Sequence, residues 1–413
     1  MHLRTLRNTV LAAALAIAGP APADLAPAAT PPVSRALETP PAAWEGPVSA
    51  LVAGGGDTHI APRPRGDAAA SGSVRPPAYF YRGLPYGSES LVQPLRLVLN
   101  GGFGILQLDN RDKRLGKIAY GTGLDNVWMN IRDPFTAIRE TGGWSDFLER
   151  EVLPLSVNSN KAQFWPNYTQ HLIGGGMSYR MYVEWFRHHG WRHPKWMSGA
   201  TMVMHHVINE TVENDAYRGW RTDPIADMYL FDPLGVVLFS HDGVARFFGE
   251  TLHMADWSYQ PSIDPADGSL INNGQNFALK YDLPWSRRWQ VFYHYGTHAE
   301  LGFSRRLNEE DSFSFGAGLR AGELVELDDG FRTVDLAASA GVFYDRNNSL
   351  LASFVMAKTK EYRFRFNVYP GVLQVAGVSP GLFLADRRNR GLVFGLTFDF
   401  LPALPAGLAS DFH

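Results

Sequence analysis

The sequence predicts a mainly β protein, an antiparallel β-barrel of about 10 to 14 strands with an α-helical insert of about three helices. Three observations predict this fold. Residues 276–400 alternate apolar and polar side chains, whereas residues 147–250 follow a helical period. Aromatic residues make up 13% of the chain, and 41 residues are glycine. Aromatic girdles and tight turns between strands give barrel proteins such a composition.

Residues 1–23 have the features of a secretory signal peptide. Arg4 and Arg7 precede an apolar segment, and the small residues 21–23 form a cleavage site. The chain contains no cysteine, which excludes a lipid-anchoring cysteine, disulfides and thiolate metal sites. We therefore expect an exported protein.

Residues 24–78 are rich in Pro, Ala and Gly without any period, which predicts a disordered leader. We expect N-terminal strands and loops in residues 79–146. Within them, residues 95–109 place Leu95, Leu97 and Leu99 at alternate positions, and this pattern predicts a strand or hairpin.

Residues 147–250 predict the helical insert. Its three expected helices are residues 168–190, 193–220 and 223–249. Pro194 and Pro224 stand in first turns, and Gly190 and Gly219 lie just past helix ends. None of the three has the long uncharged apolar run of a membrane-spanning helix. The glycines at 174–176 lack the context of a phosphate loop and favour close helix packing.

Residues 251–401 predict the strands of the barrel, and residues 402–413 a tail. In residues 361–370, Phe364 and Phe366 share one face with Tyr362 and Val368, opposite Arg363, Arg365 and Asn367. An apolar face opposite a polar face is what lipid outside and water inside require. The expected strands are residues 276–283, 288–296, 298–307, 311–322, 333–345, 349–358, 361–370, 372–378 and 391–400.

The last predicted strand is similar to the C-terminal strand that outer-membrane barrels present to their assembly machinery. Leu392, Phe394, Leu396, Phe398 and Phe400 form its apolar face. The sequence thus predicts an outer-membrane β-barrel, with outer-membrane lipid and the barrel assembly machinery as partners. The net charge of −3 gives no basic field for nucleic acid. A soluble barrel or sandwich would also alternate, and it would act as a soluble periplasmic binding module.

A polar cluster is expected where the three helices meet. Charged groups are rarely buried alone, so polar residues on packed helices must find one another. The residues expected to meet are His171 in the first helix, His206, Glu210, Glu213 and Asn214 on one face of the second, and Asp223 and Asp227 in the third.

Two interpretations of this cluster stay open. As a site, His206, Glu210 and Asp227 would be catalytic, by holding a divalent metal or by acid-base chemistry at Glu210, and the other four residues would bind. As a structural network, the same groups would only join helices, and no cofactor would be needed. The chain contains no HExxH motif.

Four segments, in order, resemble a family of bacterial outer-membrane proteins known as a domain of unknown function. They are residues 94–111, 164–180, 205–214 and 223–235. The set of Glu210, Asp223, Asp227, Asp232 and Gly235 is also similar to acidic motifs of predicted periplasmic membrane-associated proteins. The resemblance covers residues 95–235. It implies a location and an architecture with polar-faced helices before a β-rich half, and it implies no activity.

Three functions follow as hypotheses. In the first, the helical insert plugs an outer-membrane barrel, and the protein is structural or gates the passage of a small solute or lipid. In the second, an outer-membrane enzyme acts on lipid or lipopolysaccharide through the His/Glu/Asp cluster. The third is the soluble periplasmic binding module.

Overall fold

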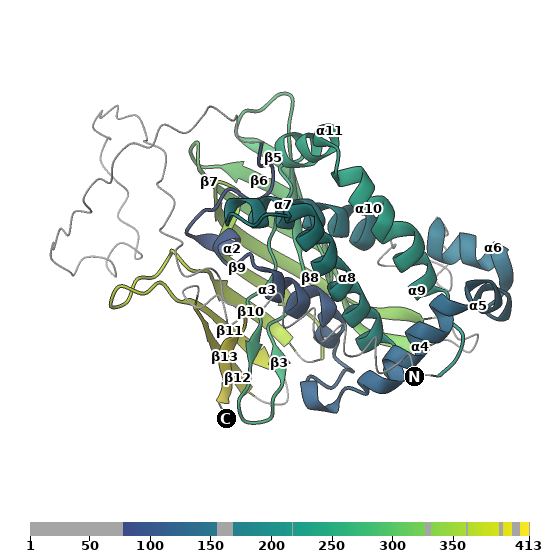
Figure 1. The fold of residues 1–413 in the computed structure, drawn as a ribbon. Helices are drawn as coiled ribbons and strands as arrows, with labels where there is room; N and C mark the ends of the chain where they lie inside the picture. The colour runs from purple at the N-terminus through teal and green to yellow at the C-terminus, as the bar shows by residue number, and fades with distance from the viewer. Residues whose placement is uncertain are drawn as a thin grey trace, which may run out of the picture. The chain divides into compact units, whose positions relative to one another are not determined.

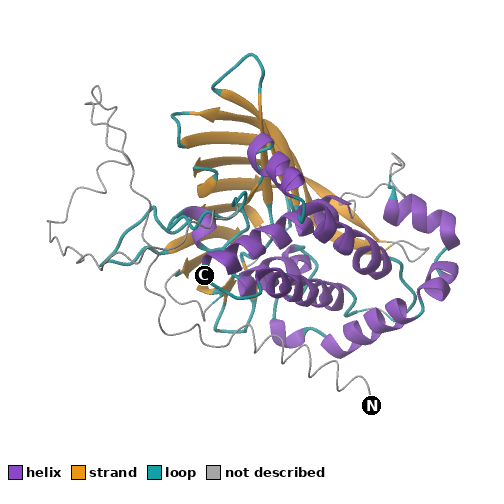
Figure 2. Ribbon diagram, turned by 45° about the horizontal axis from the view of Figure 1, so that its top comes forward, coloured by secondary structure: helices purple, strands orange, loops and turns teal. Residues whose placement is uncertain are grey.

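The computed structural model places a group of helices on one face of a large β-sheet (Figures 1 and 2). The predicted signal peptide and nearly all of the predicted leader lie outside the described residues. The structure describes residues 77–154, 168–216, 218–326, 332–360, 362–387, 391–398 and 405–412.

The sheet confirms the expectation of a mainly antiparallel β protein. Its 13 strands follow the order β1-β4-β5-β6-β7-β8-β9-β10-β11-β12-β13-β2-β3, and only the pair of β13 and β2 is parallel. The end strands β1 and β3 do not pair with each other within the described chain. The strands are β1 (Ala255–Asp256), β2 (Ser262–Ile263), β3 (Leu270–Ile271), β4 (Phe277–Asp282), β5 (Trp289–Tyr295), β6 (His298–Arg306), β7 (Asp311–Glu326), β8 (Arg332–Arg346), β9 (Ser349–Ala357), β10 (Tyr362–Val368), β11 (Gly381–Arg387), β12 (Gly391–Thr397) and β13 (Gly407–Phe412).

Eight of the nine predicted strands are confirmed, as β4 to β10 and β12. The prediction for residues 372–378 is wrong, because this segment is a turn in which Ala376 and Gly377 have positive φ. The strand follows it as β11. The predicted tail is also corrected, since β13 pairs with β12. Alternation alone could not separate these short segments from the turns beside them.

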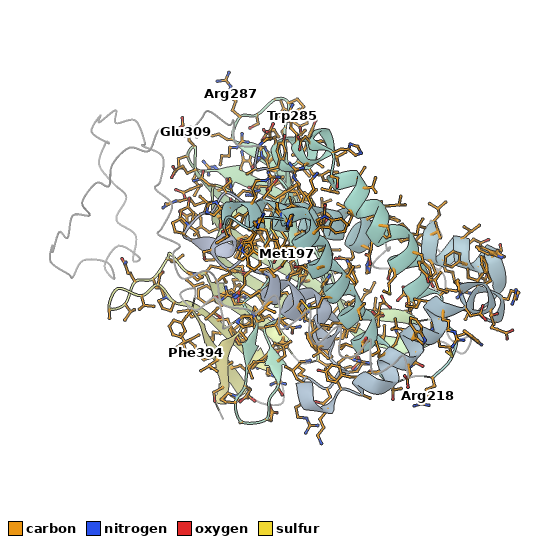
Figure 3. All side chains as sticks on the ribbon, viewed as in Figure 1. Met197, Arg218, Trp285, Arg287, Glu309 and Phe394 are labelled. Atoms are coloured by element: carbon orange, nitrogen blue, oxygen red, sulfur yellow. The ribbon has the colours of Figure 1, made fainter. Side chains whose placement is uncertain are left out.

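The two faces of the sheet differ in polarity. The face away from the helices is apolar: Leu301 is 62% exposed and Phe303 is 45% exposed, and Figure 3 shows Phe394 on this side of β12. Other exposed apolar residues on the strands are Tyr281, Trp289, Tyr293, Phe313, Phe315, Leu319, Val325, Leu336, Val342, Met356, Phe366, Leu392 and Leu408. Buried polar residues on the strands include Lys280, Gln290, His294, Glu300, Ser304, Ser314, Arg320, Asp345, Ser353, Arg365 and Asn367. Apolar strand residues such as Phe292, Phe343 and Val355 are buried on the inner side as well, so that side is mixed, whereas the exposed side is apolar.

A register shift at the start of β10 corrects one face assignment. The sequence predicts Tyr362 on the apolar face and Arg363 on the polar one. The shift lies between Tyr362 and Phe364, so Tyr362 is buried inside and Arg363 points outward, where it pairs with Asp386. A bulge adds one residue to a strand and reverses the faces on one side of it.

The predicted strand at residues 95–109 and the N-terminal strands of residues 79–146 are wrong. These residues form helical turns and helices, starting with α2 (Gly87–Ser90) and α3 (Pro94–Leu97). Pro94 occupies the first turn of α3, a position that suits proline. Gly101 then passes so near α8 that an added Cβ would lie 2.1 Å from Nε2 of His205. Packing against α8 therefore overrides the alternating leucines.

Helices form in residues 168–251 as expected, and further helices begin well before residue 147. The third expected helix is interrupted at Ser240 and His241, because α10 ends at Phe239 and α11 begins at Asp242. No described helix is long and apolar enough to cross a membrane. The remaining helical elements are η2 (Val98–Gly102), η3 (Gly104–Gln107), η4 (Leu115–Lys117), α4 (Tyr120–Arg132), α5 (Pro134–Glu140), α6 (Gly143–Phe147), η5 (Leu148–Val152), η6 (Tyr168–Gly175), α7 (Gly176–His188), α8 (Pro194–Glu213), α9 (Asp223–Ala226), η7 (Asp227–Phe231), α10 (Asp232–Phe239), α11 (Asp242–Arg246) and η8 (Phe247–Thr251).

One buried carboxylate fixes the start of the described chain. Glu184 in α7 accepts the backbone N–H groups of Tyr79, Phe80 and Tyr81, at 3.1, 2.8 and 2.9 Å. The guanidinium of Arg180 donates to the same carboxylate at 2.9 Å. Because the three aromatic residues belong to the core around α7, this carboxylate anchors a hydrophobic segment through its backbone.

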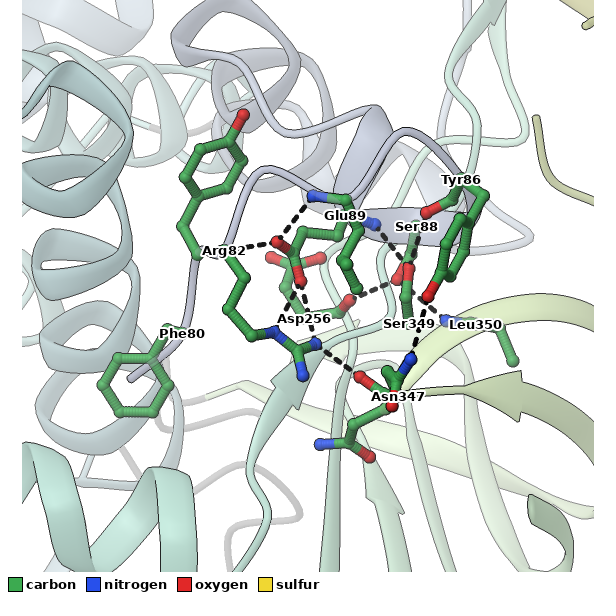
Figure 4. A network of polar contacts seen from close by, with 12 residues as sticks. Phe80, Arg82, Tyr86, Ser88, Glu89, Asp256, Asn347, Ser349 and Leu350 are labelled. Carbon is green, nitrogen blue, oxygen red and sulfur yellow. Dashed lines mark hydrogen bonds and ion pairs between the residues drawn. The ribbon is translucent and has the colours of Figure 1, made fainter. Parts of the chain in front are cut away.

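Residues 82–89 are tied in turn to the hairpin between β8 and β9, as Figure 4 shows. The guanidinium of Arg82 donates to the carbonyl of Asn347 in the hairpin, and Ser349 Oγ donates to the carbonyl of Tyr86 at 2.9 Å. Ser88 Oγ donates to the carbonyl of Asp256 at 2.8 Å. The carboxyl of Asp256 lines a small pocket here, and burial raises its pKa to about 6.

We expect Glu184→Gln to lower the free energy of unfolding by about 2–3 kcal/mol, because hydrogen bonds to a buried charge are stronger than those to a neutral amide. Denaturant unfolding of the purified protein measures this. Glu309→Gln is the control, because Glu309 is exposed in the turn after β6 (Figure 3). Equal losses in the two variants would contradict the anchoring role.

Asp256 should make stability depend on pH. Its pKa is raised from 3.8 to about 6 in the folded state, so the folded protein holds a proton that the unfolded chain has released. Its contribution is complete below pH 4 and disappears as the pH rises through 6, a loss of up to about 3 kcal/mol. Asp256→Asn should lack this part of the pH profile, and the exposed Asp125→Asn should keep it. Parallel profiles for all three proteins would reject the assignment.

Candidate functional site

The helices bring the predicted polar residues to one place. His171 comes from η6, and His206 and Glu210 from α8. Asp223 begins α9, Asp227 begins η7, and Asp232 begins α10. Two of these residues thus lie in π-helical turns, η6 and η7, and three further π-helical turns, η2, η5 and η8, lie elsewhere in the described helices.

The π-helical turn η7 sets the direction of two carboxylates. Asp227 and Asp232 are five residues apart, and a regular α-helix would turn them to different sides. A π-helical turn bonds residues five apart, so it aligns Asp232 with Asp227 on the side of His171. The ring of His171 lies between them, with Nε2 3.3 Å from Asp227 Oδ2 and Nδ1 3.0 Å from Asp232 Oδ1.

Two glycines allow η6 and α10 to approach closely. An added Cβ at Gly235 would lie 2.8 Å from the carbonyl of Leu172, and one at Gly176 would lie 2.8 Å from the carbonyl of Gly235. Since real Cβ atoms do not come this close to backbone, only glycine fits. The predicted role of glycines 174–176 in helix packing is thus confirmed for Gly176, whereas Gly174 packs against Phe277 of the sheet. The close approach at Gly235 explains how His171 reaches Asp232.

The cluster contains two groups of three possible ligands. His171, His206 and Asp232 form the first group, and Glu210, Asp223 and Asp227 form the second. Within each group the ligand atoms lie within 4.8 Å of one another. His206 Nδ1 is 3.2 Å from Asp232 Oδ2. The His171–Asp227 contact joins the groups, so they form one continuous site.

A second ring of residues orients these groups. The side-chain amide of Asn214 donates to Glu210 Oε2 at 3.3 Å, and the backbone carbonyl of Asn214 accepts from Asn126 in α4 at 2.8 Å. Thr222 Oγ1 donates to Glu151 at 3.0 Å just before Asp223. Such supporting hydrogen bonds are typical around metal ligands, where they fix the ligand orientation.

Burial and charge crowding shift the pKa values of the cluster in opposite directions. Burial, then the neighbouring Asp223 and Glu210, raises the pKa of Asp227 well above its usual range. Burial, then His205 and His171, lowers the pKa of His206 well below its usual range. Burial opposes the charged form of His171, yet Asp232 raises its pKa overall. The site therefore has an excess of carboxylates that a bound cation would relieve.

Two deeply buried atoms without hydrogen-bond partners also favour a bound cation. Asp227 is 2% exposed and its Oδ1 has no hydrogen-bond partner, and the Nδ1 of the buried His205 also has none. A buried acceptor without a donor costs about 1–3 kcal/mol, and more when it is charged. A closed structural network would pair such atoms.

All seven predicted residues lie in or beside this cluster. His171, His206, Glu210, Asp223 and Asp227 are in the two groups. Asn214 supports Glu210, and Glu213 stays at the partly exposed edge, where its charge acts on His171. The sequence-based site set omitted Asp232, because helical spacing separates it from Asp227. Glu151 was missed too, because it lies at the start of the predicted helical insert, before the first of the three expected helices.

Burial varies across the cluster. Glu210 is 1% exposed, whereas the side chains of His171 and Asp232 are 16% and 14% exposed. His171, Asp232, Asp223 and Glu213 therefore form the side of the site that solvent reaches. The first group is nearer to solvent than Glu210 and Asp227.

Another polar cluster lies inside the sheet, and it does not have the geometry of a nucleophilic triad. His298 Nδ1 is 3.1 Å from Ser339 Oγ and 3.4 Å from Glu300 Oε1, while its Nε2 meets the hydroxyl of Tyr259 at 3.0 Å. In a triad, serine and carboxylate occupy opposite ring nitrogens. Here they share one nitrogen, so this cluster serves to pair buried polar groups.

No family model, no curated protein and no solved structure matches the chain. The function of the chain is therefore inferred from the arrangement of its side chains.

Proposed function

We propose that this chain is an outer-membrane protein whose helical part binds divalent metal ions and hydrolyses an ester or phosphoester of lipid or lipopolysaccharide. The convergence of His171, His206 and Asp232 with Glu210, Asp223 and Asp227 carries the proposal. The apolar outer face of the sheet supports the location, because lipid favours a continuous exposed surface of Leu, Phe and Val on one face of the strands.

A hairpin supports the proposal that the sheet is closed as a barrel. Trp257 N–H donates to the carbonyl of Asn276 at 2.9 Å, and Tyr259 N–H to that of Gly274 at 3.0 Å. These bonds continue the β1·β4 pairing toward the β2·β3 pairing, so β1 leads into β2 and β3 into β4. With β2 against β13 and β4 against β5, this hairpin would join the two sides of the sheet. Closure removes unpaired edges, which lipid does not tolerate.

The donor atoms suit two kinds of metal ion. Two imidazoles and a carboxylate, as in the first group, suit Zn²⁺, whereas the three carboxylates of the second suit a harder ion such as Mg²⁺ or Mn²⁺. Adjacent ions about 3.5–4 Å apart are used in hydrolysis, because they activate water and stabilise the charge on the attacked ester. The exposed edge with His171 and Asp232 would face the substrate.

One observation favours a second function, a metal-locked plug. Glu210 and Asp227 are 1% and 2% exposed, which suits a site that holds helices together inside a barrel. On this view the ions stabilise the helical plug, and passage of a small solute or lipid depends on its opening. The two functions differ in whether metal supports turnover or only stability.

The metal site predicts retention of up to two ions per chain. Metal-depleted protein in detergent, reconstituted with Zn²⁺ and Mn²⁺, is analysed by elemental mass spectrometry. A metal at about 100 times its dissociation constant should raise the free energy of unfolding by about 2.7 kcal/mol. Asp227→Asn in the second group and His206→Ala in the first should each lower the metal content and the stabilisation. His241→Ala is the control, because His241 is exposed at the start of α11. Unchanged metal content in both cluster variants would refute the site.

Turnover of a chromogenic phosphodiester and a chromogenic carboxyl ester in detergent micelles separates the two functions. For the enzyme, Glu210→Gln lowers metal-dependent turnover at least about a hundredfold. For the plug, metal raises stability and neither ester is cleaved above the rate of the metal alone.

The lipid-facing sheet predicts recovery in the outer membrane and a folded band that shifts on boiling. Leu301→Arg should lower the free energy of unfolding in lipid by about 2–4 kcal/mol, because a charge in the lipid-facing band is costly. Leu307→Arg is the matched control: Leu307 is 54% exposed but lies in the turn after β6. A Leu301→Arg protein that folds equally well and is extracted without detergent would reject the membrane location and favour the soluble periplasmic module.

A further inference from the structure

Two buried arginines inside the sheet differ from the other charged residues around them. Lys280 pairs with Asp345 at 2.6 Å, and His294 pairs with Glu300 at 3.0 Å. Arg320 and Arg365 are 2% and 3% exposed, yet neither forms an ion pair with a carboxylate in the described chain. A buried, unpaired charge is strongly unfavourable, so a counter-charge is expected.

Aromatic rings cover the guanidinium of Arg365 and leave its donors available. Its Cζ lies 4.1 Å from the ring centroid of Tyr362 and 5.0 Å from that of Tyr259. Its Nε and Nη1 have no hydrogen-bond partner. The hydroxyl of Tyr259 is already engaged with His298. The two rings stack on the cation, while the free N–H groups lie in its plane, the direction in which an oxyanion binds.

The neighbouring residues add further donors. Asn367 follows Arg365 by two residues on the same face of β10, and Ser353 is its partner on β9. Asn367 Oδ1 accepts from Asn272, so its amide donors face elsewhere, and Nδ2 has no partner. Ser353 Oγ and Arg320 Nε also have none. Arg320 Nη2 reaches only the carbonyl of Gln107, at 3.4 Å.

We propose that Arg320 and Arg365, with Asn367 and Ser353, bind a phosphate-type oxyanion on the inner face of the sheet. Two guanidinium groups, an amide and a hydroxyl all donate hydrogen bonds, and a tetrahedral oxyanion accepts several of them while it neutralises both charges. The site is separate from the His/carboxylate cluster, since none of its residues belongs to either ligand group. It rests on neither the metal nor the hydrolysis.

The test is titration of metal-depleted protein in detergent with inorganic phosphate and, in a second arm, with a short-chain phosphatidic acid. Calorimetry measures binding, and thermal unfolding measures stabilisation. We expect saturable binding of one phosphate group per chain. Arg365→Met should weaken it by at least about tenfold, and should itself unfold at the same or a higher temperature in phosphate-free buffer. Arg305→Met is the control, because Arg305 is an exposed arginine of β6.

Each outcome bears on the proposal. A response to inorganic phosphate supports a free ion, and a response to the lipid alone supports a headgroup. The side-chain amide oxygens of Gln260 and Asn272 are also without partners, and they suit ordered water. Absence of binding in both arms, or equal binding by the Arg365→Met variant, would overturn the site and leave ordered water as the partner of these donors.

Discussion

The polarity of the sheet is the constraint on which the rest of the structure depends. Leu301, Phe303 and their neighbours occupy the outer face, so the polar residues of each strand point inward, toward the helices. Groups buried there must find partners, because a buried polar atom without one is costly. The pairs Lys280–Asp345 and His294–Glu300 meet this requirement within the sheet. The helices also supply partners: the side-chain amide of Asn100 donates a hydrogen bond to the backbone carbonyl of Tyr259.

The requirement that buried polar groups have partners also applies to the cluster of histidines and carboxylates in the helices. Burial and the charges of Asp223 and Glu210 raise the pKa of Asp227, and burial lowers the pKa of the neighbouring His206. Such an arrangement stores unfavourable electrostatic energy unless a cation neutralises it. The chain nevertheless builds this arrangement with π-helical turns and with the glycines at 176 and 235, features that cost stability in a plain helix. Their combined presence around His171 favours a site over a passive hydrogen-bond network.

The anchoring of residues 79–89 connects the helices to the sheet. Glu184 holds residues 79–81 against α7, and residues 82–89 then reach the hairpin between β8 and β9. The core around α7 includes Phe277 and Tyr295 from the sheet, so helices and strands share one hydrophobic cluster. The helices that carry the polar cluster are therefore fixed to the sheet by packing as well as by polar contacts, which limits how far the site can move.

The sequence by itself determined eight of the 13 described strands and most of the site. A period of two places Leu392 and Phe394 outward on β12 whatever surrounds them, and a helical period places His206 and Glu210 on one face. The tertiary structure alone decided three features. Packing against α8 made helices of residues 95–109, a register shift turned Tyr362 inward, and the π-helical turn brought Asp232 to His171. Each of these depends on contacts between residues far apart in the chain or on a local departure from the ideal period, and a periodic pattern in the sequence contains neither.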